Sequence, residues 1–482
     1  MSTPNPHEGA LRIHTYLQTC TREGLSVFFI GVGGVMMSSL ALLTARAGHP
    51  VHGSDRTSTP LTDAMAAEGI RFHNGHAASH IPPDCGLVVY TVAISEDNPE
   101  YREALERGIP CVSRADYLGA LMTNYTRRIG VAGMHGKSTC TSMCAETFIR
   151  AGADPTVISG AELAIMGGAY RIGGKEHFIF EACEYMDSFL DFNPSIAVIL
   201  NVEMDHVDYF HSLDQVKRSF AAFAGLTGEN GYAVANADDE NVTSALSGYK
   251  GNKITFGINS PADFRAENIN NEKGPYSFDV TAYGKHLCRI ELSVSGYHNI
   301  YNALATAAVA HLCGLSPEAI ADGLHSFGGA ARRMEHKGSL AGCGAPVYDD
   351  YGHHPTEVKT TLEGAMALCK NGGRLLCAFQ SHTYTRTKEF LTEFVDALDV
   401  ADKVFSVDIY SARETDTLGV SASLIAKMIG EKAVYCPSFA DTADAICKEA
   451  RENDVVIVMG AGDVYKVFSC LGDRLISHGG AK

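Results

Sequence analysis

The sequence predicts an α/β protein with largely parallel sheets and more than one domain. Short apolar runs alternate with helix-like stretches along nearly the whole chain, which is typical of parallel sheets covered by helices. The 482 residues are too many for one hydrophobic core, so we expect two or three domains. The runs interpreted as strands are 27–30, 87–90, 129–132, 178–181, 196–201, 375–379, 404–407 and 455–459.

The composition is that of an ordinary soluble protein with an acidic charge balance, which is frequent among cytosolic enzymes. A net charge of −17 argues against a nucleic-acid surface, which needs a basic face to neutralise phosphates. The 14 cysteines show no C-x-x-C zinc spacing and suit a reducing compartment. No apolar run approaches the roughly 18 residues of a membrane span, and the first residues lack a signal pattern. We therefore expect small-molecule partners, no nucleic acid and no membrane span.

Three blocks are predicted along the chain. The first covers residues 1–122, and the polar stretch 123–128 is interpreted as a linker. The second covers 123–331 and includes a hydrophilic stretch, 236–290, whose weak alternation favours antiparallel strands. The third covers 332–482.

A glycine-rich turn in the first block follows the strand at 27–30. It contains Gly31, Gly33 and Gly34 and precedes a helix over 38–47 and a strand over 51–55 that ends in Asp55. This order is close to the dinucleotide-binding fingerprint, except that Met36 replaces its third glycine. Two interpretations remain open: a site for a ligand that contains a diphosphate, and an ordinary tight turn. A nicotinamide-dependent dehydrogenase would not explain the motif of the second block.

That motif is the run Gly133-Met-His-Gly-Lys-Ser-Thr139, between a predicted strand at 128–132 and a helix at 139–151. A glycine turn there points backbone N–H groups at one spot beside the positive end of the helix, where phosphate binds. Lys137 would reach the outer phosphate oxygens, and Ser138 would offer a hydroxyl to Mg²⁺. Val131 stands where the standard P-loop has glycine, and a simple surface turn is the alternative.

Acidic residues follow the next two predicted strands. Glu181 ends the first of them, and Asp205, His206 and Asp208 come after the second. Mg²⁺ prefers hard oxygen ligands together with nucleotide phosphates, so Ser138 and Glu181 are expected to share one ion. His206 is expected to hold a second ion or to orient a phosphate. The competing interpretation is a set of solvated loop residues.

Two clusters stand out in the third block. Asp349 and Asp350 precede the adjacent His353 and His354, and such a group is costly to bury without a ligand or metal. After the strand at 375–379, Arg386 offers a planar fork suited to a carboxylate, and His382 is placed to assist. A further strand-to-glycine turn, Gly460-Ala-Gly-Asp463, is by itself only a turn prediction.

Taken together, these segments resemble the Mur ligase family, from about residue 26 to 465. The motifs that carry the resemblance are Gly31-Val-Gly-Gly34 with Met37-Ser38, Gly133–Thr139, Asn201 with Asp205-His206, Tyr297-His298-Asn299 with Asn302-Ala303, Arg332-Arg333, Asp349-Asp-Tyr-Gly-His-His-Pro-Thr-Glu357, Phe379-Gln380 with His382 and Tyr384-Thr-Arg386-Thr, and Gly460–Asp463. The run 349–357 is typical of the alanine-adding member.

The resemblance implies three domains: a Rossmann-like N-terminal domain, a central P-loop-type ATPase domain with a mostly parallel sheet, and a Rossmann-like C-terminal domain. It implies an ATP- and Mg²⁺-dependent ligase that joins L-alanine to the lactyl carboxylate of UDP-N-acetylmuramate through an acyl phosphate, in peptidoglycan precursor synthesis. The alternatives are a sister ligase that adds a tripeptide to the same sugar nucleotide and a non-catalytic nucleotide-binding relative. A monomer or a homodimer is expected.

The resemblance also implies roles for individual residues. The UDP-sugar would meet Gly31, Gly33, Gly34, Ser54 and Asp55. ATP would meet Gly133, Met134, His135, Gly136, Lys137, Ser138, Thr139, His298, Asn299, Asn302, Arg332 and Asp350. The amino acid would meet Tyr351, His382 and Arg386. The metal ions would be held by Ser138, Glu181 and His206. The catalytic residues would be Lys137, Glu181, His206 and His353, with His353 near the amine.

The chain departs from the family pattern at four positions. Met134 and Ser138 replace threonines, although serine keeps the hydroxyl that magnesium needs. Cys183 stands where an acid is common, and Thr383 where an arginine is frequent, which weakens the assignment of the amino-acid site. We predict no carbamylated lysine.

Overall fold

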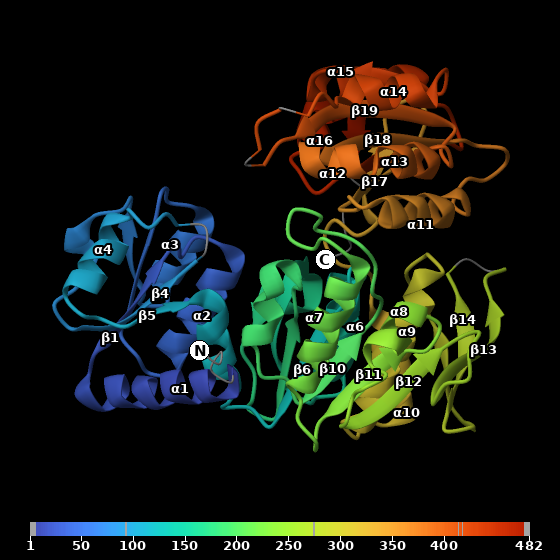
Figure 1. The fold of residues 1–482 in the computed structure, drawn as a ribbon. Helices are drawn as coiled ribbons and strands as arrows, with labels where there is room; N and C mark the ends of the chain where they lie inside the picture. The colour runs from blue at the N-terminus through green and yellow to red at the C-terminus, as the bar shows by residue number, and fades with distance from the viewer. Residues whose placement is uncertain (1–5, 92–93, 273–274, 413, 417, 477–482) are drawn as a thin grey trace. The chain divides into compact units, whose positions relative to one another are not determined.

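The computed structural model describes residues 6–91, 94–272, 275–412, 414–416 and 418–476 (Figure 1). Its chain forms two compact units. The first unit comprises Met1–Gly133, Phe148–Asn201 and Lys217–Thr255, and the second comprises Met134–Thr147, Val202–Val216 and Phe256–Lys482.

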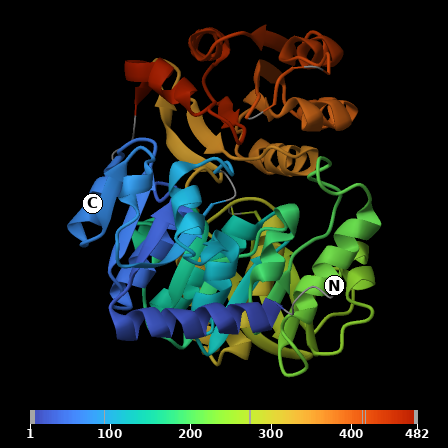
Figure 2. The same ribbon diagram turned by 60° about the vertical axis from the view of Figure 1, so that its left-hand side comes forward.

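The first unit begins with a five-stranded parallel sheet in the order β3-β2-β1-β4-β5. Its strands are β1 Ser26–Ile30, β2 Val51–Asp55, β3 Arg71–Asn74, β4 Cys85–Tyr90 and β5 Cys111–Ser113. Its helices are α1 Pro6–Glu23, α2 Val35–Arg46, α3 Pro60–Ala67, α4 Pro99–Glu106 and α5 Arg114–Met122, with a short 3₁₀ turn η1 Ala78–His80. The long helix α1, dark blue in Figures 1 and 2, packs against α5. This strand order places the loop after β1 at the point where the order reverses, the usual place for a ligand.

The same unit contains a second parallel arrangement, β11-β10-β6-β9-β7, with β8 antiparallel at its edge. The strands are β6 Arg127–Ala132, β7 Thr156–Leu163, β8 Gly168–Arg171, β9 His177–Glu181, β10 Ile196–Ile199, β11 Tyr232–Asn236 and β12 Asn252–Gly257. The helices along this part of the chain are α6 Lys137–Arg150, α7 Leu213–Gly225 and α8 Glu240–Ala245, with 3₁₀ turns η2 Ala164–Met166 and η3 Tyr185–Asp191; α6 as far as Thr147 and α7 as far as Val216 belong to the second unit. The chain passes between the two units within α6, α7 and β12.

The second unit contains an antiparallel ribbon and two helices. They are β13 Phe264–Asn270, β14 Ser277–Ala282, β15 Lys285–Glu291, α9 His298–Leu312 and α10 Pro317–Ser326. Helix α10 begins where the Ser316 side chain caps it and Pro317 opens its first turn, a frequent helix start.

A seven-stranded sheet follows in the order β20-β19-β18-β21-β17-β16-β22, parallel from β20 to β17. Its strands are β16 Glu335–Leu340, β17 Pro346–Asp350, β18 Leu375–His382, β19 Lys403–Tyr410, β20 Ala433–Cys436, β21 Val455–Met459 and β22 Leu475–Ile476. Its helices are α11 Pro355–Met366, α12 Tyr384–Glu389, α13 Leu391–Leu398, α14 Ala422–Ile429, α15 Phe439–Glu449 and α16 Lys466–Leu471, with η4 Gly472–Arg474.

Both faces of this sheet are buried. Along β21, Val456 and Val458 belong to one core with α15 and α16, whereas Val455 and Ile457 belong to another with α11, α13 and α14. Helices therefore cover the two faces, as expected for parallel strands that read as continuous apolar runs.

All eight strands predicted from the sequence are present. Several boundaries were wrong, among them that of the helix placed at 139–151, which runs from Lys137 to Arg150. The linker placed at 123–128 ends earlier, because β6 begins at Arg127. The helix placed at 38–47 begins at Val35. The stretch 236–290 is antiparallel only from β13 to β15, since it also contains α8 and β12 pairs in parallel with β13.

Among the described helices, none combines the length and hydropathy required to cross a lipid bilayer.

Candidate active site

The loop between β6 and α6 has the geometry predicted for a phosphate site. Gly133 and Gly136 have φ of 153° and 80°, conformations that favour glycine. Lys137 and Ser138 open α6, at the end of the helix that carries partial positive charge. The Lys137 Nζ donates to the Met134 carbonyl at 3.2 Å. The ammonium group of Lys137 is therefore held against the backbone of its own loop.

His135 of this loop lies between two carboxylates. Its Nε2 is 3.0 Å from Glu203 Oε2, and its Nδ1 is 3.4 Å from Glu357 Oε1. Burial alone would lower the pKa of His135, but the bonds to Glu203 and Glu357 raise it to about 9. The ring is therefore a cation at neutral pH.

The stability of the second unit is expected to depend on pH through His135. Because its folded-state pKa lies above the ordinary 6.5, the protonated ring stabilises the fold fully below pH 6.5. This contribution, roughly 3 kcal/mol for such a shift, is lost as the pH rises through about 9. Urea unfolding of the wild type and of His135→Gln should differ most below pH 6.5 and progressively less toward pH 9. A difference that stays constant across this range would contradict the prediction.

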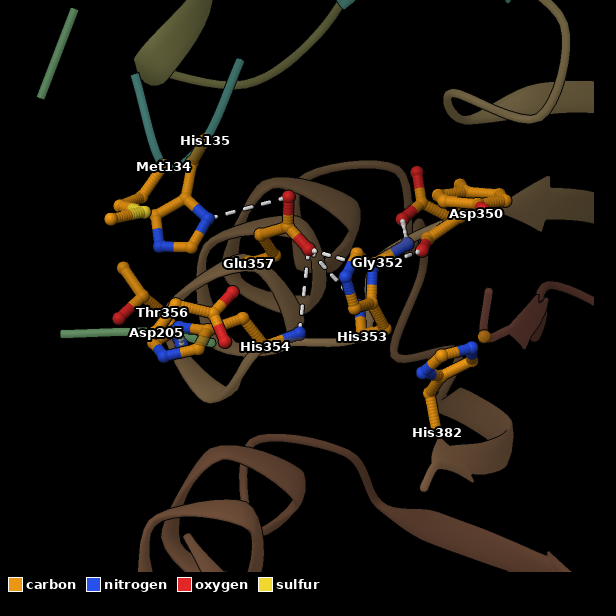
Figure 3. A network of polar contacts seen from close by, with 12 residues as sticks. Met134, His135, Asp205, Asp350, Gly352, His353, His354, Thr356, Glu357 and His382 are labelled. Atoms are coloured by element: carbon orange, nitrogen blue, oxygen red, sulfur yellow. Dashed lines mark hydrogen bonds and ion pairs between the residues drawn. The ribbon is translucent and has the colours of Figure 1, made fainter. Parts of the chain in front are cut away.

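Glu357 holds the start of helix α11 together (Figure 3). Its Oε2 accepts the backbone N–H groups of His353 at 3.0 Å and His354 at 3.3 Å, while the His354 ring caps the helix. This is a capping box with histidine in the place of serine or threonine. Burial would raise the pKa of Glu357, but His353, His135 and Arg333 hold it well below its usual value.

Three histidines of this region, His353, His354 and His382, are neutral. Burial lowers the pKa of His353 to about 3 and that of His382 to about 4, and it also lowers the pKa of His354. Neutral imidazoles can accept hydrogen bonds, whereas pKa values this far below neutrality make them weak bases.

Arg386 forms a buried ion pair with Asp205. The Asp205 Oδ1 accepts from Arg386 Nη2 at 2.8 Å and from Nε at 3.1 Å, and it also accepts the His206 N–H at 2.6 Å. Arg386 Nη1 lies 3.3 Å from His382 Nδ1, and the expected binding of a carboxylate by these two side chains stays a prediction. Burial would raise the pKa of Asp205, but Arg386 holds it well below its ordinary value.

Asp350 and Arg332 are both held by backbone groups. The Asp350 carboxylate accepts the N–H groups of Gly352 at 2.8 Å and Met334 at 2.9 Å, and burial raises its pKa. Arg332 lies 3.3 Å from Asp349, donates to the Gly460 carbonyl at 2.6 Å and stacks over the Tyr351 ring. The predicted nucleotide contacts of Asp350 and Arg332 stay predictions.

The residues predicted for the adenine side lie at the start of α9. Asn302 donates to the Asn299 side chain at 3.0 Å, and the carbonyl of Asn302 is 3.7 Å from the Cys140 sulfur of α6. Burial lowers the pKa of His298 to about 4. The structure thus places this part of α9 against the helix that carries Lys137 and Ser138.

In the first unit, Asp55 closes the turn after β1. Its Oδ2 accepts the Gly33 N–H at 2.8 Å, and a Cβ on Gly33 would lie 2.8 Å from the same oxygen. Ser54 is fully buried and donates to Glu100 at 2.6 Å, and Glu100 also pairs with His76 and His80. The hydrogen bond to Glu100 therefore holds Ser54 in place at the end of β2, beside the turn. Glu100 is a partner that no sequence pattern indicated.

Glu181 ends β9, as predicted, and its carboxylate accepts the Gly160 N–H at 3.0 Å. Its expected sharing of an ion with Ser138 stays a prediction, as does the metal role of His206.

Two partners in the second unit were missed from the sequence. Glu203 contacts His135 and accepts the Thr356 hydroxyl at 2.7 Å, and no spacing pattern marks this pair. Glu357 was part of a recognised motif, and its distance of three residues from His354 is a capping-box signal that would have indicated its role.

Parallel α/β sheets and a glycine loop with lysine and serine at a helix start define a nucleotide-binding α/β protein. Three family models match the chain in succession: Mur ligase family, catalytic domain, at 26–126; Mur ligase middle domain at 131–310; and Mur ligase, glutamate ligase domain, at 332–462. The chain belongs to the Mur ligase family.

Individual relatives are similar over nearly the whole chain. A UDP-N-acetylmuramate–L-alanine ligase of Acetivibrio thermocellus is 45% identical over 92% of this chain and 94% of the relative. A protein of the same name from Caldanaerobacter subterraneus subsp. tengcongensis is 43% identical over 92% and 96%. The crystal structure of a UDP-N-acetylmuramate-alanine ligase from Thermotoga maritima matches with a TM-score of 0.76 at 27% identity, covering 93% of this chain and 98% of that one. The predicted three-domain α/β fold is confirmed, whereas the boundaries at 122 and 331 stay predictions.

Proposed function

We propose that this Mur ligase joins L-alanine to the lactyl carboxylate of UDP-N-acetylmuramate at the expense of ATP, in peptidoglycan precursor synthesis. The names and the coverage of the relatives support this function. The structural observation that carries it is the contact of His135 with Glu357. This contact joins the loop expected to bind ATP to the 349–357 run expected of an alanine-adding enzyme.

We assign the substrates to the three predicted blocks. Residues 1–122 would bind the UDP-sugar at the Gly31–Gly34 turn, residues 123–331 would bind ATP, and residues 332–482 would bind the amino acid. The Gly33–Asp55 hydrogen bond supports the first assignment, since it orders the turn that would face a diphosphate.

In the first chemical step, a lactyl carboxylate oxygen attacks the γ-phosphorus of ATP, and ADP leaves. The product is an acyl phosphate. Negative charge spreads over the phosphoryl oxygens in the transition state, and catalysis rests on groups that stabilise this charge. Lys137 supplies a cationic amine at the loop, and the N–H groups at the start of α6 supply aligned dipoles.

Magnesium fits the donor groups of this region. The Ser138 hydroxyl lies at the start of α6, and Glu181 ends a strand that pairs in parallel with β6; hydroxyl and carboxylate oxygens are the hard ligands that magnesium prefers. When bound, the ion would neutralise part of the phosphate charge. Ser138 and Glu181, with His206 for a second ion, are the residues we propose to hold it.

In the second step, the amine of L-alanine attacks the acyl carbonyl carbon, the new C–N bond forms and phosphate leaves. The amine loses a proton, which ends on the leaving phosphate, so the step releases hydrogen phosphate. His353 is neutral at physiological pH because burial lowers its pKa to about 3, so its imidazole is in a state that can accept hydrogen bonds from an amine.

The alanine carboxylate would bind Arg386 on the side of the guanidinium that Asp205 does not occupy. The Arg386 guanidinium is already paired with Asp205, while its Nη1 points to His382. We propose that the alanine carboxylate is held at the Nη1 side, with His382 and Tyr351 adjacent, while Asp205 keeps the guanidinium oriented.

The test is mass spectrometry of a reaction that contains the protein, UDP-N-acetylmuramate, ATP, Mg²⁺ and a pool of amino acids, with phosphate release measured in parallel. We expect UDP-N-acetylmuramoyl-alanine and one phosphate per product. Product only with a tripeptide acceptor would identify the sister ligase. No phosphate release with any acceptor would identify a non-catalytic relative and would overturn the proposal.

We further propose that the protein acts in the cytoplasm on these small molecules, as a monomer or a homodimer. The cytosolic supply of ATP and of sugar nucleotides supports this location.

A further inference from the structure

Three side chains from distant segments converge in the second unit. They are His135 of the nucleotide loop, Glu203 after β10 and His354 at the start of α11. One ligand atom of each lies within 4.8 Å of the other two, and the His135 and His354 ring centroids are 4.6 Å apart. His135 and His354 lie at the left of the network in Figure 3.

His354 has a ring nitrogen that the fold leaves unused. The residue is only 3% exposed, and its Nδ1 accepts the Thr356 N–H at 3.3 Å. Its Nε2 is buried and has no hydrogen-bond partner within the described residues. A buried polar atom without a partner costs about 1–3 kcal/mol, so this nitrogen indicates a missing ligand.

The donor set selects a particular class of cation. Two imidazole nitrogens and one carboxylate oxygen suit Zn²⁺ and neighbouring transition metals, whereas Mg²⁺ prefers oxygen ligands and keeps its water. Three protein ligands of the His₂Glu type leave a fourth position open. Zinc–ligand bonds of about 2.0–2.2 Å place ligand atoms roughly 3.4 Å apart, so the side chains need to move by on the order of 1 Å.

We propose that His135, Glu203 and His354 form a site for a zinc-class divalent metal ion, separate from the expected magnesium site. The ion displaces the proton between His135 Nε2 and Glu203, whose atoms are now 3.0 Å apart, and this proton passes to solvent. The ion also binds Nε2 of His354, whose ring hydrogen moves to Nδ1, so the 3.3 Å bond from the Thr356 N–H is given up. The site joins the nucleotide loop to the start of α11 through one ion. It does not depend on the proposed function.

A metal titration tests the site directly. Co²⁺ and Zn²⁺ are titrated into the nucleotide-free protein in excess Mg²⁺, with visible Co²⁺ absorption and calorimetry as readouts. We expect one site with the intense absorption of a low-coordinate Co²⁺ ion. His354→Gln and Glu203→Gln should each weaken binding at least roughly tenfold, since loss of even an outer-shell partner costs about 10–100-fold.

Two control variants accompany the titration. His286→Gln removes an exposed histidine and should leave the affinity unchanged. Glu181→Gln should also leave it unchanged; a loss with Glu181→Gln but not with His354→Gln would place the ion at the magnesium site and overturn the proposal. Absence of any binding to the wild type would overturn it as well.

X-ray absorption of the zinc-loaded wild type provides a measurement that needs no variant. We expect two imidazole ligands and oxygen, without sulfur. A sulfur ligand would assign the ion to some of the 14 cysteines and would refute the site.

Discussion

Lys137→Ala is expected to lower formation of UDP-N-acetylmuramoyl-alanine at least ~10²–10³-fold, the cost of removing one group that stabilises transition-state charge. The reason is that the lysine opens α6 beside the glycine turn, where its charge adds to that of the helix dipole. The measurement is the initial rate of phosphate release at saturating substrates. This expectation rests on the proposed function.

Lys359→Ala provides the matched control, because Lys359 is an exposed lysine of α11 and lies outside the proposed site. It should keep the wild-type rate. Circular dichroism of both variants verifies that they are folded. If Lys137→Ala retained more than a tenth of the wild-type rate, Lys137 would not have the proposed role.

Asp205→Ala is expected to destabilise the second unit by about 3–5 kcal/mol, the usual cost of removing one partner of a buried ion pair. The side chains of Asp205 and Arg386 are 5% and 8% exposed, so the guanidinium would stay buried without its carboxylate. Urea unfolding monitored by tyrosine fluorescence measures the loss. A double variant, Asp205→Leu with Arg386→Met, should be less destabilised than Asp205→Ala, because it leaves no unpaired charge.

An exposed ion pair of the same unit is the control. Asp444 and Arg474 are 71% and 43% exposed and lie 2.6 Å apart. Asp444→Ala should cost less than about 1 kcal/mol, since exposed pairs contribute little. Equal losses for Asp205→Ala and Asp444→Ala would show that burial does not govern the Asp205 pair.

The strands were predictable because they are buried on both faces. A strand such as β21, whose five residues are all buried, appears in sequence as an uninterrupted apolar run. The helix starts were less predictable than the strands, because a helix cap depends on a single side chain. Helix α11, for example, begins at a histidine cap, and histidine is not a usual cap residue. Strand β16 consists mostly of polar residues and β22 has only two residues, so neither gives a comparable apolar signal.

The candidate site was predictable where one short segment supplies several groups. The nucleotide loop and the 349–357 run are examples, because glycine, lysine and histidine positions within one turn constrain each other. His382 and Arg386 are only four residues apart, at the end of β18 and in α12, so the short turn between the strand and the helix keeps the two side chains close.

The sequence alone determined the α/β fold, the phosphate loop and the family resemblance, because each depends on residues close together in the chain. Only the tertiary structure decided which charges neutralise each other. Asp205 and Arg386 are 181 positions apart, and His135 and Glu203 are 68 apart. Burial removes the water that would otherwise screen such groups, so the fold sets both their partners and their protonation states.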